Sequence, residues 1–116
     1  MKKAIQTALM GSSVLALALG ICTEASALDA AAAQTLARQS GCFKCHAVDK
    51  KKDGPAYKEV AAKYRGKSDA EARLITHVTS GEKAKFEDGH EEEHPIVKSK
   101  DKNEIKNLVD WILSLK

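Results

Sequence analysis

Three residues of this chain have the types and the spacing for cofactor chemistry: Cys42, Cys45 and His46, in the run Gly41-Cys42-Phe43-Lys44-Cys45-His46. Two thiols separated by two residues can add to the two vinyl groups of one porphyrin, while the adjacent imidazole ligates the iron. The motif therefore predicts one covalent haem c, attached through Cys42 and Cys45, with His46 as an iron ligand.

The same motif has two alternative interpretations, a redox dithiol and half of a zinc site. A dithiol of the thioredoxin type lies at a strand-to-helix junction, and no strand-rich pattern flanks this motif. A structural zinc site brings a second pair of ligands at short spacing, and the later histidines, His77, His90 and His94, show no such spacing. The context favours haem over both alternatives.

The first 27 residues have the pattern of a secretory signal peptide. Lys2 and Lys3 precede a mostly apolar run over residues 4–21, and Ala25-Ser26-Ala27 supplies a small-residue cleavage site. An uncleaved membrane anchor and a lipoprotein modified at Cys22 are the alternatives; polar residues dilute the run, and a bulky residue precedes Cys22. We expect cleavage after Ala27 and a periplasmic protein without a membrane anchor.

Residues 28–116 would then form one domain of 89 residues, too short to bury a large core by itself. A covalently attached porphyrin would supply the missing apolar centre. The net charge is +3 for the whole chain and +2 once Lys2, Lys3 and Glu24 are removed. So small a charge argues against nucleic acid as the main partner.

Charged residues are nevertheless grouped along the chain. Three lysines occupy positions 50–52, three glutamates occupy positions 91–93, and further lysines follow from Lys98 onward. The simpler interpretation of such runs is a solvent-exposed surface, and the alternative is a role in docking partner proteins.

The sequence predicts helices on both sides of the motif. Asp29 can cap an alanine-rich helix that continues to about Ser40. Gly41 either terminates this helix or allows another helix to cross closely. Near the C-terminus, Asp101 and Glu104 give a capping signal before apolar residues at helical spacing around Trp111.

Two further helices are predicted between these. Pro55 suits the first position of a helix that carries Tyr57 and Tyr64 on its apolar face and ends at Gly66. A carbonyl of this loop could also accept a hydrogen bond from the second ring nitrogen of His46. A capping-box pattern at residues 68–71 opens another helix that contains His77 and stops at Gly81.

Residues 82–100 are polar and include Gly89 and Pro95, which predicts a long loop. His77 lies beside the apolar face of its helix, so we expect a packing or hydrogen-bonding residue near the haem edge rather than an iron ligand. No segment alternates clearly enough to predict a strand. The expected fold class is all-α, with about four helices around one haem.

The chain resembles class I cytochromes c, in particular the small soluble monohaem cytochromes of bacterial respiratory chains. The similarity extends over residues 28–116 and rests on Gly41-Cys42-Phe43-Lys44-Cys45-His46, Gly54-Pro55-Ala56-Tyr57-Lys58, Val60-Ala61-Ala62-Lys63-Tyr64 and Leu108-Val109-Asp110-Trp111-Ile112-Leu113-Ser114. It implies that the terminal helices cross near Gly41 with Trp111 packed there, that the Pro55 carbonyl accepts a hydrogen bond from His46, and that one haem edge is exposed to partner proteins.

One departure from the family concerns the distal ligand, which is typically a Met followed by Pro. Residues 28–116 contain no Met, and His94 followed by Pro95 stands at the corresponding place. We therefore expect His46 and His94 to be the two iron ligands. The alternatives are His90, a deprotonated lysine such as Lys85 or Lys98, and a site with no protein ligand.

A second departure concerns the aromatic residue that lies near the haem propionates in this family. Phe86 is the nearest candidate, and its ring cannot donate a hydrogen bond. The sequence therefore leaves open how the propionates are bound.

The predicted function is that of an electron carrier rather than an enzyme, because iron with two protein ligands has no place for a substrate. A second imidazole and nearby acidic residues favour ferric iron, so a low midpoint potential is expected. Partners would be redox proteins that dock weakly through charge, and the protein would be a monomer. The alternatives are a sensor or gas-binding haem protein in which His94 detaches, and a subunit of a fixed redox complex.

Overall fold

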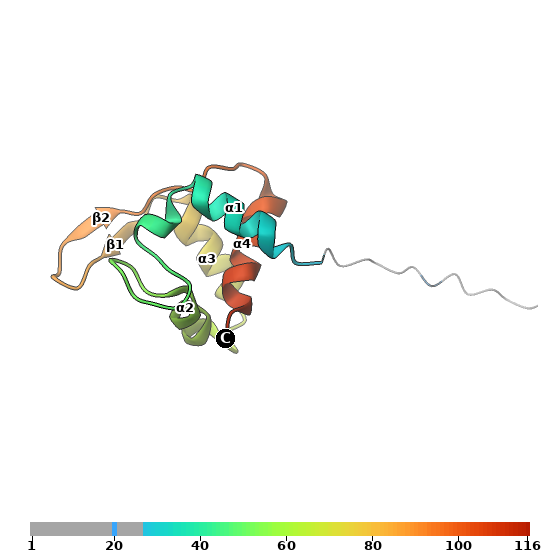
Figure 1. Cartoon of the computed structure of the whole chain (residues 1–116), viewed down its shortest axis with the longest axis horizontal. Coiled ribbons are helices and arrows are strands. Elements are labelled where there is room, and N and C mark those ends of the chain that lie inside the picture. Colours follow the sequence, from blue (N-terminus) through green and yellow to red (C-terminus); the bar gives the residue numbers. More distant parts are fainter. Residues whose placement is uncertain (1–19, 21–26) are drawn as a thin grey trace, which may run out of the picture.

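The computed structural model describes residue 20 and residues 27–116, so most of the predicted signal peptide, including Cys22, lies outside the described residues. The described residues form mainly helices, with one small hairpin (Figure 1). The elements are α1 (Ala30–Gln39), a 3-10 turn η1 (Cys42–Lys44), α2 (Tyr57–Tyr64), α3 (Ala70–Thr79), β1 (Lys83–Lys85), β2 (Glu91–Glu93) and α4 (Lys102–Ser114). The expectation of about four helices is confirmed.

Both predicted caps of the terminal helices are present. The Asp29 carboxylate accepts a hydrogen bond from the backbone N–H of Ala32 at 2.9 Å, which satisfies a free donor at the start of α1. Asp101 accepts in the same way from Asn103 and Glu104 at the start of α4. Asn107 of α4 also exchanges two hydrogen bonds with the backbone of Asp29, so the capped start of α1 is tied to α4.

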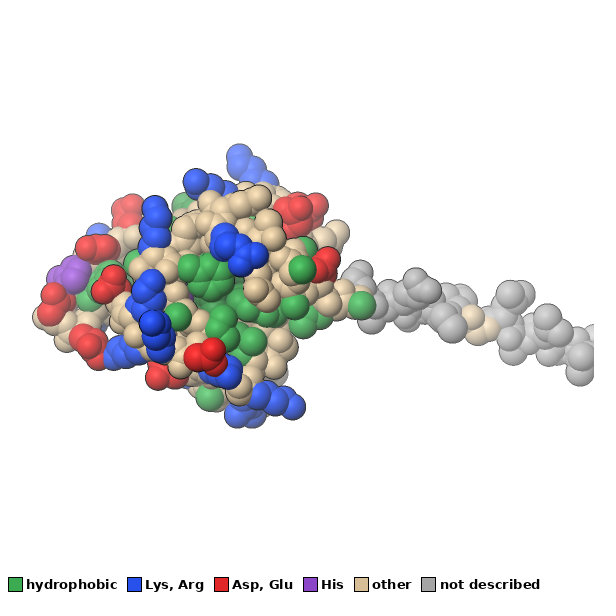
Figure 2. All heavy atoms as spheres, viewed as in Figure 1, with side chains coloured by type: hydrophobic (Ala, Val, Ile, Leu, Met, Phe, Trp, Pro, Cys, Tyr) green, Lys and Arg blue, Asp and Glu red, His purple; other side chains and the backbone are tan. Residues whose placement is uncertain are grey.

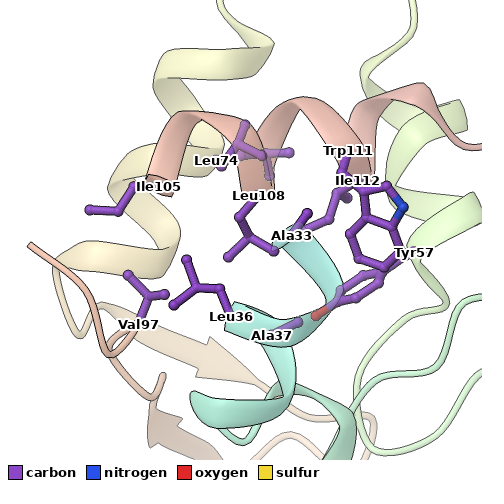
Figure 3. Close-up of a cluster of buried hydrophobic side chains, with 11 residues drawn as sticks. Ala33, Leu36, Ala37, Tyr57, Leu74, Val97, Ile105, Leu108, Trp111 and Ile112 are labelled. Carbon is purple, nitrogen blue, oxygen red and sulfur yellow. The ribbon is translucent and has the colours of Figure 1, made fainter. Parts of the chain in front are cut away.

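The core lies where α1 packs on α4 (Figure 3). Ala33 and Ala37 of α1 are almost fully buried, and so are Leu108 and Val109 of α4. Two alanines one turn apart leave little side-chain volume between the helices, so the backbones can approach closely. Trp111 continues this cluster along α4.

The terminal helices pack on each other with Trp111 in their common core, as the resemblance implies, but Gly41 is not the residue at which they approach closely. Gly41 has φ +74°, and the three atoms nearest to a β-carbon built there all belong to the Lys44 side chain. Gly41 is thus the left-handed residue that follows the end of α1, which is the first of its two interpretations. The small residues at the contact between the helices are Ala33 and Ala37 instead.

The predicted starts of the two middle helices are wrong by one or two residues. α2 begins at Tyr57 and not at Pro55, because the backbone N–H groups of Tyr57 and Lys58 donate to the carbonyls of Ala47 and Val48. α3 begins at Ala70, and no side-chain capping bond is formed at its start. Residues 68–69 form a turn instead of the first residues of the helix.

The long loop predicted over residues 82–100 contains a short antiparallel hairpin, which sequence reasoning missed. β1 and β2 pair Lys83 with Glu93 and Lys85 with Glu91. Opposite charges directly across an antiparallel pair stabilise it, although β2 consists of three exposed glutamates and each strand has only three residues. The hairpin projects beyond the helices (Figure 1), and acidic side chains gather at this end of the molecule (Figure 2).

Among the residues that the structure describes, no helix combines the length and the apolar character needed to cross a membrane.

Candidate functional site

A cavity of about 540 Å³ lies between the Cys-x-x-Cys-His motif and the segment that follows β2. Its volume is in the range of small-molecule and cofactor sites. Cys42, Cys45 and His46 line one side, and His94 lines the other. The remaining walls come from α2, α3, the hairpin and α4, so every described element except α1 contributes a lining residue.

The loop after the motif holds the His46 ring. The Nδ1 atom of His46 lies 2.7 Å from the Pro55 carbonyl oxygen, so the hydrogen bond predicted for this carbonyl is present. A carbonyl can only accept, which makes Nδ1 the protonated nitrogen and leaves the lone pair on Nε2. The Tyr57 ring stacks on the His46 ring, with the two ring centroids 5.0 Å apart and the two planes 22° from parallel.

The charge state of His46 suits a metal ligand. Burial lowers the pKa of His46 below its usual value, although the bond to Pro55 acts in the opposite direction. A lowered pKa favours the neutral imidazole, which is the form that binds a metal.

The two thiols are free and half-buried. Burial raises the pKa of the Cys42 thiol, and a hydrogen bond with Tyr57 acts against this shift. Burial likewise raises the pKa of the Tyr57 hydroxyl. A raised thiol pKa is the opposite of what activates a redox dithiol, whose attacking cysteine needs a lowered pKa.

His94 faces His46 across the cavity. The centroids of the two imidazole rings are 6.2 Å apart. The Nδ1 atom of His94 lies 2.9 Å from the carbonyl oxygen of Pro95, so the lone pair of His94 is also left on Nε2. Burial lowers the pKa of His94, and Glu82 is the one carboxylate among the groups that shift it in the described part of the chain.

The hairpin and the loop that carries the motif are joined outside the cavity. Lys51 forms an ion pair with Glu87, which lies between β1 and β2. Lys52 donates to the carbonyl of Phe43 at 2.6 Å. Two of the three lysines in the run 50–52 therefore make contacts within the protein.

Residues 30–116 match the family model for cytochrome c. The chain belongs to the cytochrome c family. It is 70% identical to the class 1 cytochrome MtoD of Sideroxydans lithotrophicus, whose crystal structure superposes with a TM-score of 0.72 over 76% of this chain and 97% of that one. It is also 44% identical over 80 residues to cytochrome c-551 of Allochromatium vinosum, covering 69% of this chain and 82% of the relative. Cytochrome c-551 of Pseudomonas aeruginosa is 40% identical over 83 residues, with 72% and 76% covered.

Membership of this family identifies the cofactor as haem c, bound covalently through Cys42 and Cys45. The residues present fit such a group, since a partly apolar cavity adjoins two thiols and an imidazole with a free Nε2. Haem iron supplies one-electron redox chemistry, and cytochromes c carry electrons rather than transform substrates.

In this cytochrome c, two of the three other sequence-predicted ligands, His90 and Lys98, do not line the cavity. His90 is exposed near the end of the hairpin and does not line the cavity; its ring stacks on Phe86, with centroids 4.3 Å apart. Lys98 does not line the cavity either, whereas Lys85 and Phe86 do. Within residues 27–116 there is no group of three or more His, Cys, Asp or Glu side chains placed to hold a metal ion.

The residue that sequence reasoning missed in the site is Glu82. Its carboxylate oxygen Oε1 lies 2.6 Å from Nδ1 of His77 and 2.8 Å from Nη1 of Arg73. The His77 ring lies beside His94, with centroids 4.1 Å apart. The hydrogen bond to His77 and that to Arg73 lower the pKa of Glu82. No local motif marks Glu82, because its partners come from α3 and from the segment after β2.

Proposed function

We propose that this cytochrome c is a periplasmic electron carrier whose haem iron is ligated by His46 and His94. The observation that carries the proposal is the facing pair of imidazoles, 6.2 Å apart across the cavity. Two imidazoles on opposite sides of one metal ion have centroids about 6 Å apart, since each metal–nitrogen bond is about 2 Å and each ring adds about 1 Å.

The state of both rings supports the same ligand pair. Each Nδ1 is bonded to a backbone carbonyl, that of Pro55 for His46 and that of Pro95 for His94. In each ring the lone pair that can bind a metal is therefore the one on Nε2. Burial lowers the pKa of both rings and so favours their neutral form.

Two imidazole ligands make this protein a low-potential member of its family, because imidazole is a stronger donor than a thioether and favours ferric iron. With His46 and His94 both holding the iron, no position would remain for a substrate, and the haem would supply one-electron exchange with other proteins. The partners are redox proteins that dock transiently on the monomer, guided by charge at the acidic hairpin. The predicted signal peptide, residues 1–27, would deliver the chain to the periplasm.

An absorption spectrum of the purified protein tests this function. We expect low-spin spectra in both redox states at neutral pH, and no rapid change on adding CO to the reduced form. His94→Ala should give a high-spin reduced form that binds CO, whereas His90→Ala should behave like the wild type. A wild-type protein that binds CO as fast as His94→Ala would refute ligation by His94 and would revive the sensor interpretation.

A further inference from the structure

Glu82 connects the segment that carries His94 to helix α3. It lies between α3 and β1, and its side chain is 28% exposed. The carboxylate contacts Arg73 and His77, one turn apart on α3. The backbone carbonyl of the same residue accepts a hydrogen bond from the N–H of His94 at 3.0 Å.

A second bond fixes the other end of the same segment. The N–H of Val97 donates to the carbonyl of Val78 at 2.9 Å, and Val97 is buried in the core. Residues 94–97 are thus held at both ends by the C-terminal part of α3 and the residues that follow it. At the Val97 end the anchor is apolar burial. At the His94 end it is Glu82, whose backbone carbonyl bonds to His94 and whose carboxylate bonds to α3.

Apart from Glu82, the structure holds His94 through the bond from its Nδ1 to the Pro95 carbonyl and through β2, which ends at the preceding residue. Pro95 has no N–H to donate, and the following Ile96 is exposed. The His77 ring lies against the His94 ring, and its Nδ1 is bonded to the Glu82 carboxylate. Glu82 therefore acts on His94 by two routes, through its own backbone carbonyl and through the orientation of His77.

We propose that Glu82 is a positioning residue for the distal ligand, which keeps the imidazole of His94 in place by anchoring its backbone and its neighbour His77 to α3. This role rests on the proposed ligation by His94. It gives a reason why His94 would stay bound, because a ligand on a short segment without helix or strand structure would otherwise leave the iron readily.

The test is the rate at which CO binds to the reduced full-length haem protein, because CO can bind only after His94 leaves. Glu82→Ala removes both side-chain contacts, and we expect CO binding about tenfold faster than in the wild type. Glu82→Gln keeps an acceptor oxygen for Arg73 and His77, so its rate should lie within about threefold of the wild type. Asp69→Ala, which removes an exposed carboxylate that makes no side-chain capping bond at the start of α3, is the matched control and should leave the rate unchanged.

The outcomes separate this inference from the function on which it rests. If the wild type resists CO and Glu82→Ala resists it equally, Glu82 does not position His94, while ligation by His94 stands. If the wild type binds CO as fast as His94→Ala, the ligation itself is wrong. If Glu82→Ala does not fold, the exposed partner can be changed instead, since Arg73→Ala removes one of the two contacts of the Glu82 carboxylate. A CO-binding rate equal to that of the wild type would overturn the proposal, and a faster rate would support it.

Discussion

Gly54 lies so close to the ring of His46 that a β-carbon built on it would be 2.5 Å from Cε1. Its backbone N–H also donates to the carbonyl of Cys45 at 2.7 Å, so residue 54 cannot retreat without breaking the turn that follows the motif. The lack of a side chain at position 54 is thus what lets the loop place the Pro55 carbonyl against Nδ1 of His46.

Gly54→Ala should therefore displace the His46 ring or the loop. We expect a loss of about 1–3 kcal/mol in the free energy of unfolding, the usual cost of forcing an extra carbon into a packed site. Denaturant unfolding measures the loss, and the absorption spectrum should change with it, because the bond to Pro55 orients the ring.

Gly66→Ala is the control for this experiment. Gly66 has φ +78°, but nothing lies within 4 Å of a β-carbon built there. The backbone strain should cost about 1 kcal/mol and leave the spectrum unchanged. Equal spectral effects in the two variants would show that contact with His46 is not what constrains position 54.

The side of the site that carries Cys42, Cys45 and His46 could be predicted from the sequence because its residues are adjacent in the chain. The spacing of the two thiols and the adjacent imidazole is enough to predict covalent haem attachment. The helix caps Asp29 and Asp101 were likewise predictable, since a cap bonds to residues two or three positions away.

The hairpin and the role of Glu82 could not be predicted in this way. The strands place Lys83 opposite Glu93, but each has only three residues, and the three glutamates of β2 lack the alternation that marks a half-buried strand. Glu82 meets Arg73 because α3 has ended and the chain has turned back on it. Such contacts form only once the chain has folded, and the pattern of residues along the sequence does not indicate them.

The second prediction concerns the midpoint potential. His94→Met replaces an imidazole by a thioether, which stabilises ferrous iron, so we expect the potential to rise by an amount on the order of 100 mV within the ~0.8 V range that axial ligands cover. Redox titration of the purified protein measures the change. His90→Met should leave the potential unaltered, because His90 does not line the cavity. A His94→Met potential equal to that of the wild type would count against ligation by His94.

The third prediction concerns the core. Leu108 is fully buried and lies in the cluster that joins α1 to α4. Leu108→Ala removes three carbons from this cluster, and we expect a loss of about 2–5 kcal/mol in the free energy of unfolding. Ile96→Ala is the control, since that side chain is 56% exposed. Similar losses for the two variants in denaturant unfolding would contradict the position of the core.

The fourth prediction is a pH dependence at the hairpin. The hydrogen bond with Asp88 is the main cause that raises the pKa of His90, and Glu92 adds to it. A histidine whose pKa is raised on folding stabilises the folded form fully below its unfolded pKa of about 6.5, and this contribution is lost as the pH rises through the folded pKa.

The hairpin should therefore open more readily as the pH rises through that window. Amide hydrogen exchange at Phe86, whose N–H donates to the His90 carbonyl at 2.9 Å, reports the opening once intrinsic exchange rates are divided out. His90→Gln keeps a side chain of similar length but does not titrate, so its protection should be independent of pH in the same range. Protection at Phe86 that is flat with pH in the wild type, or equally sloped in His90→Gln, would show that the pairing of His90 with Asp88 contributes nothing to the hairpin.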